Sequence, residues 1–70
     1  MSVKLNILVG QNIRNFRQKR KLTQERLEEL SGVDVKYIQK IEGKKPPNIS
    51  LKVIEKLTKA LEVHPSKLFI

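Results

Sequence analysis

A short segment in the middle of the chain combines apolar anchors with outward hydrogen-bond donors. Ile38 and Ile41 lie three residues apart, a spacing that places both on one face of a helix over residues 35–42. The outward positions of that helix are then Val35, Lys36, Gln39 and Lys40. Ammonium and amide groups donate hydrogen bonds to base edges and phosphates, and a helix fits the major groove of duplex DNA, which is roughly 12 Å wide. The chemistry that this segment suggests is recognition by hydrogen bonding.

Nucleophiles, general bases and metal ligands are sparse in the sequence. The chain has no cysteine, and its one histidine, His64, precedes Pro65 at a predicted helix start without an evident acidic or nucleophilic partner. The sequence contains neither a phosphate-cradling glycine loop nor a cluster with metal-ligand spacing. We therefore expect a protein that is not an enzyme, with no catalytic residue, no metal and no cofactor.

Capping residues divide the chain into short helices. Thr23, Asp34 and Ser50 each precede an apolar periodic segment, where a side-chain oxygen can accept a hydrogen bond from a free backbone N–H. Gly32 and Gly43 follow two of these segments, and glycine readily adopts the left-handed conformation that ends a helix. The helices expected from these signals span about residues 6–21, 24–31, 35–42 and 51–62, with a short fifth helix that begins at Pro65.

Each expected helix carries apolar residues on one side, and together these sides can form one core. The residues expected there are Val9, Ile13, Phe16, Leu27, Leu30, Val33, Ile38, Ile41, Ile54, Leu57, Leu61, Leu68 and Phe69. Seventy residues support a single small core. We therefore expect one domain over residues 1–70, all-α, folded as a compact five-helix bundle that contains a helix-turn-helix at about residues 24–42.

The charge of the chain favours an anionic partner. Fifteen Lys and Arg residues against seven Asp and Glu residues give a net charge of +8 at pH 7, which attracts polyanions. No apolar stretch is long enough to span a membrane, and the first residues lack the pattern of a signal peptide. Binding to lipid or RNA would favour clustered aromatic side chains, but the only aromatic residues are Phe16, Tyr37 and Phe69. We therefore expect a cytoplasmic protein that binds duplex DNA and no membrane.

Five sequence segments together carry a family resemblance. They are LTQERL at 22–27, SGV at 31–33, YIQKIEG at 37–43, PNISL at 47–51 and LTKALEV at 57–63. This pattern resembles the lambda-repressor-like (Cro/repressor, XRE-type) helix-turn-helix DNA-binding domains, over about residues 10–69. The resemblance implies a five-helix bundle whose third helix is the recognition helix. It also implies a small transcriptional regulator, most simply a repressor, that binds an inverted-repeat operator as a homodimer.

The resemblance also implies roles for individual residues. Gln24 corresponds to a glutamine that binds a DNA phosphate and can brace the recognition helix. Three positions correspond to side chains that face base edges: Val35, Lys36 and Lys40. Tyr37 and Gln39 would flank the DNA backbone. The resemblance also assigns phosphate contacts to the basic loop over residues 44–48, through Lys44, Lys45 and Asn48. For each lysine a phosphate contact or a solvated surface charge remains an alternative, and Tyr37 could instead be a half-buried packing residue.

Two further positions concern the orientation of the recognition helix. Arg17 and Glu42 correspond to a structural salt bridge between the first and third helices. Glu28 departs from the family pattern, which has a small residue, typically alanine, packed between the second and third helices. Because an unpaired buried carboxylate is costly, we expect Glu28 to turn outward or to find a partner such as Lys36 or Tyr37.

The main alternative to DNA recognition is a protein-interaction module on the same fold, with Phe69 and Ile70 in an exposed partner surface. Docking surfaces usually centre on aromatic and apolar anchors, whereas the outward face of residues 35–42 is mostly polar and basic. If the chain dimerises, we expect contacts from the fourth and fifth helices and from residues 68–70. No small-molecule effector site is evident. Repressor, activator, antitoxin and restriction-modification control roles all share these features.

Overall fold

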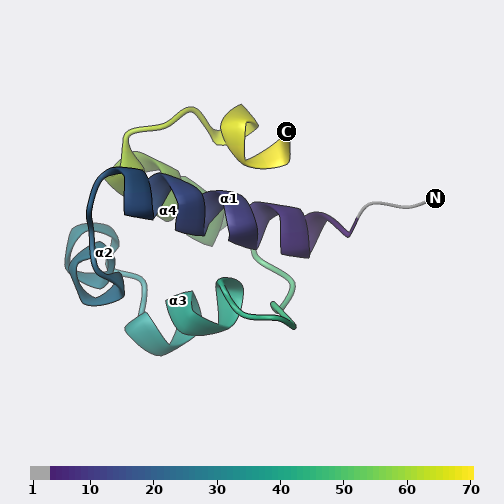
Figure 1. Ribbon diagram of the computed structural model, residues 1–70, viewed down its shortest axis with the longest axis horizontal. Helices are drawn as coiled ribbons and strands as arrows, with labels where there is room; N and C mark the ends of the chain where they lie inside the picture. The colour runs from purple at the N-terminus through teal and green to yellow at the C-terminus, as the bar shows by residue number, and fades with distance from the viewer. Residues whose placement is uncertain (1–3) are drawn as a thin grey trace.

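Residues 4–70 are described by the computed structural model, which is all-helical over that range (Figure 1). The helices are α1 (Leu5–Lys19), α2 (Gln24–Ser31), α3 (Val35–Ile41) and α4 (Leu51–Leu61), followed by the 3-10 helix η1 (Pro65–Phe69). Residues 1–3 of the predicted domain lie outside the described part. The predicted all-α fold class is confirmed, with the fifth element a 3-10 helix rather than an α-helix. No described helix is both long and apolar enough to cross a membrane.

Side-chain caps set the beginnings of three helices, as the sequence predicts. Thr23 accepts a hydrogen bond from the Arg26 N–H at 3.0 Å, and Ser50 accepts one from the Val53 N–H at 3.2 Å. Asp34 accepts one from the Lys36 N–H at 2.7 Å. Each bond satisfies one of the free donors of a first helical turn. These caps explain why the predicted starts of α2, α3 and α4 match the observed ones.

Three helices end before their predicted residues, α1 by two residues and α3 and α4 by one each. Left-handed residues other than glycine close α1 and α4. The first helix stops at Lys19 instead of Lys21, since Lys21 is left-handed with φ 57°. The Leu22 N–H then donates to the Arg17 carbonyl, a bond typical of a Schellman closure. Glu62 ends α4 in the same conformation, also with φ 57°. A sequence search for terminal glycines cannot find such ends.

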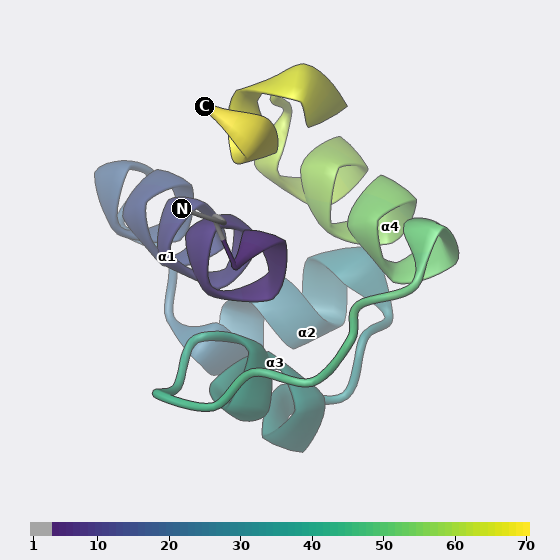
Figure 2. The same ribbon diagram turned by 90° about the vertical axis from the view of Figure 1, so that its right-hand side faces the viewer.

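The core lies where α1, α2, α3, α4 and η1 face one another (Figures 1 and 2). Its buried side chains are Val9, Ile13, Leu27, Val33, Ile38, Ile41, Ile54, Leu57, Leu61 and Leu68. Two expected members lie largely outside it: Leu30 is 47% exposed, at the end of α2, and Phe69 is 41% exposed. Only Leu68 of the chain end is fully buried, because the short turns of η1 direct its neighbour outward.

Gly10 is the point of closest approach between α1 and α3. A Cβ atom at this position would overlap the carbonyl oxygen of Ile41. The absence of a side chain thus lets the backbone of α1 lie directly against the C-terminal end of α3. This contact holds the end of α3 beside the middle of α1.

Candidate nucleic-acid interface

The turn between α2 and α3 is built from Ser31, Gly32 and Val33. Gly32 has φ 77°, and its N–H donates to the Glu28 carbonyl. The Ser31 hydroxyl donates to the Leu27 carbonyl at 2.7 Å and accepts from the Val33 N–H at 3.1 Å. Val33 is buried in the angle between the two helices. The left-handed glycine, the hydrogen bonds of the Ser31 hydroxyl and the buried Val33 side chain therefore produce the sharp turn between α2 and α3.

Glu28 has a partner that the sequence prediction did not consider. Its carboxylate accepts a hydrogen bond at 3.1 Å from the backbone N–H of Val35, the first residue of α3, and not from Lys36 or Tyr37. Asp34 accepts from the next N–H, that of Lys36. Two carboxylates thus face the positive end of the α3 dipole. The half-buried Glu28 side chain is compensated, and it links α2 directly to the start of α3.

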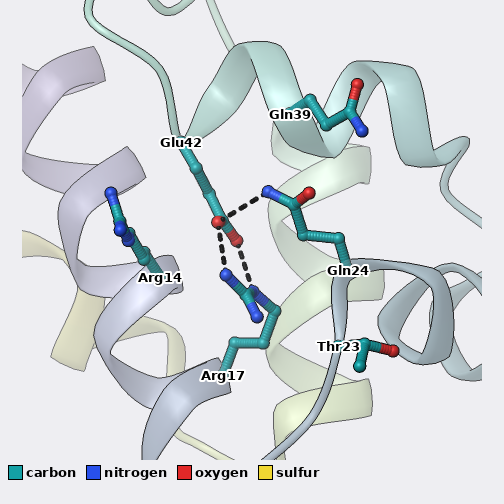
Figure 3. A pocket seen from close by; sticks show the side chains of 6 residues that line it. All are labelled: Arg14, Arg17, Thr23, Gln24, Gln39 and Glu42. Atoms are coloured by element: carbon teal, nitrogen blue, oxygen red, sulfur yellow. Dashed lines mark hydrogen bonds and ion pairs between the residues drawn. The ribbon is translucent and has the colours of Figure 1, made fainter.

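Arg17, Glu42 and Gln24 form a network behind α3 (Figure 3). The Nε and Nη2 atoms of Arg17 donate to the two carboxylate oxygens of Glu42, each at 2.8 Å. The Gln24 amide donates to Glu42 Oε1 at 3.0 Å, and Arg17 Nη1 donates to the Leu22 carbonyl at 2.7 Å. The network therefore ties α1, the start of α2 and the C-cap of α3 together.

The ion pair within this network is sheltered from solvent, with side-chain exposures of 11% for Arg17 and 4% for Glu42. The hydrogen bond with Glu42 raises the pKa of Arg17 above its already very alkaline ordinary value, against the opposing effect of burial. A raised pKa in the folded state means that this contribution to stability is lost only on passing above that alkaline range. Arg17 consequently remains charged at neutral pH.

The outward side of α3 carries the predicted recognition residues. Lys36, Gln39 and Lys40 are exposed, whereas Val35 and Tyr37 are half-buried. Tyr37 also packs against the core, and its hydroxyl donates to the Asn48 carbonyl at 3.3 Å. Tyr37 therefore joins α3 to the following loop while part of its ring remains accessible. The structure brings these five residues together on one short helix.

The basic loop after α3 is anchored at Pro46 while its lysine and asparagine side chains remain exposed. Lys44, Lys45 and Asn48 are exposed, but Pro46 is buried. The Asn6 amide donates to the Pro46 carbonyl at 2.9 Å, which fixes the loop to the start of α1. In Figure 2 the loop crosses the molecule from the end of α3 to the start of α4. The two lysines are therefore presented from an anchored backbone.

A hollow beside the Arg17–Glu42 pair reveals a residue absent from the predicted site. Its lining consists of Arg14, Arg17, Thr23, Gln24, Gln39 and Glu42 (Figure 3). Arg14 was not predicted because its role depends on how α1 lies against α3. The spacing held one clue: Arg14 precedes Arg17 by three residues, so both lie on the same side of α1. Among the described residues, no cluster of three or more His, Cys, Asp or Glu side chains could hold a metal ion.

Comparisons with known proteins agree with this architecture. The restriction-modification controller protein C.AhdI from Aeromonas hydrophila is 39% identical, with a TM-score of 0.84, over 91% of this chain and 96% of that chain. A hypothetical transcription factor from Neisseria, NHTF, is 34% identical, with a TM-score of 0.87, over 96% and 76% of the respective chains. The controller C.Esp1396I, in a structure bound to a 19 base pair DNA duplex, is 33% identical, with a TM-score of 0.84, over 96% and 88%.

No curated protein sequence gives a significant match. The helix-turn-helix family model matches residues 13–68, which contain all of α2, α3 and α4, the C-terminal part of α1 and most of η1. This match covers more than half of the chain, and it agrees with the resemblance seen in the sequence. The chain belongs to the XRE-type helix-turn-helix family, whose members are DNA-binding transcription regulators and not enzymes.

Proposed function

We propose that this chain acts as a single domain that binds duplex DNA sequence-specifically and represses transcription, with α3 as its recognition helix in the major groove. The observation that carries the proposal is the shape and chemistry of α3. Its inner side is fixed by Ile38 and Ile41, both fully buried, while its outer side presents exposed amide and ammonium donors. The Arg17–Glu42 pair and the Glu28 cap hold both ends of this short helix in place.

The proposed contacts separate into those that read sequence and those that position the protein. Lys36 and Lys40 can donate to guanine O6 or N7, and Val35 can pack on a thymine methyl group. Backbone contacts are assigned to Gln24, Tyr37, Gln39, Lys44, Lys45 and Asn48. Because Gln24 already donates one hydrogen bond to Glu42, its second amide N–H is the one available to a phosphate. The proposed base contacts thus come from α3 alone, whereas the backbone contacts come from α2, α3 and the loop that follows α3.

We further propose that two copies bind an inverted-repeat operator. The longest dimension of one copy is 36 Å, whereas the 19 base pairs bound by C.Esp1396I span about 65 Å. A duplex of that length has room for two recognition helices about one helical turn apart. Exposed apolar side chains lie near a shallow groove formed by α1, α4 and η1: Leu5, Leu51, Phe69 and Ile70. Leu51, Phe69 and Ile70 lie in the region predicted for dimerisation, and Leu5 of α1 adds to it; this surface is the proposed contact between copies.

The genes under control are proposed from the similar structures. C.AhdI and C.Esp1396I are restriction-modification controllers, and C.AhdI shares 39% identity over almost its entire chain. We assign the same kind of regulation to this chain: control of the genes of a restriction-modification system. The prediction is that the operator lies upstream of such genes. A promoter–reporter fusion carrying that upstream region should lose expression when the chain is supplied.

Binding is tested by titrating this upstream duplex and a scrambled duplex of equal length. We expect a preference of at least 10³-fold for the operator, on the order seen for specific regulators. Sedimentation of the complex should give two copies per duplex. Leu51→Ser should weaken this pairing, whereas Leu30→Ser, which removes an exposed leucine from a different surface, should not. Equal affinity for both duplexes would contradict sequence-specific regulation. Failure to bind either duplex would favour the protein-interaction module.

A further inference from the structure

Arg14 lies at the junction of two hollows next to α3 and the loop that follows it. The first hollow contains Gln24 and Gln39, and the second contains Gln11, Gly43 and Lys44. Of the residues that the structure describes, only Arg14 and Glu42 line both hollows. The Arg14 side chain therefore sits between the start of α2 on one side and the basic loop on the other.

The Glu42 carboxylate is already paired with Arg17 and Gln24, and it makes no bond to Arg14. Its Oε2 atom accepts from Arg17, and its Oε1 atom accepts from both Arg17 and Gln24. Within residues 4–70, Arg14 makes no side-chain hydrogen bond and no ion pair, and it is exposed. Figure 3 shows the Arg14 side chain beside Glu42, with no bond drawn between them. The accessible positive charge between the two hollows is that of Arg14.

The backbone determines why an arginine at this position reaches the interface. Gly10 lets α1 lie directly against the carbonyl of Ile41, and Arg14 follows one helical turn later on the same side of α1. The end of α3 and the loop that follows it are therefore brought beside the Arg14 side chain. Arg14 remains on α1, however, set back from the outward residues of α3 that would enter a groove.

We infer that Arg14 binds a phosphate of the DNA backbone, between the phosphates contacted by Gln24 and by the Lys44–Lys45 loop. The inference rests on the proposed function. It adds a phosphate contact between the contacts proposed for Gln24 and for the Lys44–Lys45 loop. A guanidinium group offers a planar pair of donors that matches two phosphate oxygens. Because α1 lies behind the recognition helix, the contact strengthens binding to any duplex and reads no base.

The test compares Arg14→Gln with Lys56→Gln on duplex DNA at several salt concentrations. Both substitutions remove one positive charge from an exposed helical position, but Lys56 lines a separate hollow with Leu30 and Lys59. For Arg14→Gln we expect affinity to fall about three- to tenfold for operator and scrambled duplexes alike. The dependence of log K on log salt should become shallower by about 0.9 for each protomer. Lys56→Gln should leave the salt slope within error of the parent's slope. Arg14→Lys, which keeps the positive charge, should retain most of the parent's slope.

The outcomes separate this inference from the proposed function. If the parent binds the operator and Arg14→Gln has the parent's affinity and slope, or matches Lys56→Gln, the phosphate contact is overturned while the proposed function stands. A loss confined to the operator duplex would mean that Arg14 reads a base, which also overturns the inference. Failure of the parent to bind any duplex would overturn both. Thermal melting of each variant verifies the fold, and equal melting temperatures are expected because Arg14 holds no partner.

Discussion

Arg17 on α1 and Glu42 at the C-cap of α3 meet through two hydrogen bonds of 2.8 Å each, a bidentate geometry that links the two helices directly. A sheltered ion pair of this kind contributes little net stability, because desolvation offsets the attraction. Its effect is therefore on orientation: Glu42 cannot move without breaking its bonds to Arg17 and Gln24.

Arg17→Met should weaken both folding and DNA binding. Removal of the guanidinium leaves the Glu42 carboxylate buried, and breaking such a pair costs roughly 3–5 kcal/mol in the free energy of unfolding. Chemical denaturation measures this loss, and titration of an operator duplex measures the affinity. The control is Lys19→Met, which removes the same charge from an exposed position on α1. Equal affinities of Arg17→Met and the parent at the same ionic strength would contradict the orienting role.

The double variant Arg17→Met/Glu42→Leu separates stability from orientation. Replacing both charges with apolar groups removes the desolvation penalty, so much of the unfolding free energy lost in Arg17→Met should return. The affinity for the operator should remain low, because no directional bond then fixes the end of α3. Full recovery of affinity together with stability would show that the pair acts through stability alone.

Glu28→Ala should destabilise the fold even though alanine is the residue typical of this position in the family. The substitution leaves the Val35 N–H without its acceptor and removes a negative charge from the start of α3. Loss of a cap costs about 0.5–2 kcal/mol, measurable by urea denaturation. The unfolding free energy of Glu28→Gln, which keeps an acceptor oxygen, should fall between those of the parent and Glu28→Ala. A Glu28→Ala protein more stable than its parent would refute the capping role.

Gly10→Ala should disrupt the contact between α1 and α3. The new methyl group would overlap a backbone carbonyl of Ile41, which cannot move independently of α3. Overpacking of this kind typically costs about 1–3 kcal/mol, which outweighs the helix propensity of roughly 1 kcal/mol gained from alanine. Gly43→Ala is the matched control, since its Cβ would come no closer than 3.3 Å to a neighbouring atom. A rise in the melting temperature of Gly10→Ala would contradict the packing described here.

Lys36 and Lys44 should respond differently to substitution. Lys36→Ala removes a donor from the outward side of α3, so the preference at one base pair should relax by about 1–3 kcal/mol. Lys44→Ala should weaken binding to all duplexes by a similar factor and make the salt dependence shallower. Affinities for single-base variants of the operator distinguish the two effects. If both substitutions changed affinity uniformly, neither lysine would read sequence.

The sequence predicted those parts of the fold that depend on local signals. Thr23, Asp34 and Ser50 marked three helix starts because an N-cap acts within one turn. The predicted ends at Lys21 and Glu62 lie two residues and one residue beyond the observed ends. Residues other than glycine adopt the left-handed conformation there, and the N–H groups that follow them donate to carbonyls five residues earlier. Leu30 was wrongly placed in the core, since helical spacing defines a face but not its outer limit.

The candidate site was predictable where it follows the sequence of α3, and less so where separate elements meet. Lys36, Gln39 and Lys40 face outward because Ile38 and Ile41 face inward. Glu28 found a backbone partner that could not be identified from side-chain pairing, because backbone donors have no sequence signature. The position of Arg14 beside α3 could not be predicted, because it depends on the close contact of α1 with α3 at Gly10. Contacts between elements therefore supplied what periodicity could not.

The central claim, that α3 reads duplex DNA as part of a two-fold symmetric complex, is tested most directly by selecting bound duplexes from a random library at two salt concentrations. We predict enrichment of an inverted repeat whose half-sites lie about one helical turn apart, with affinity that falls steeply as salt increases. Salt-sensitive binding without an enriched motif would contradict sequence-specific recognition. The absence of any bound duplex at low salt would contradict DNA binding itself.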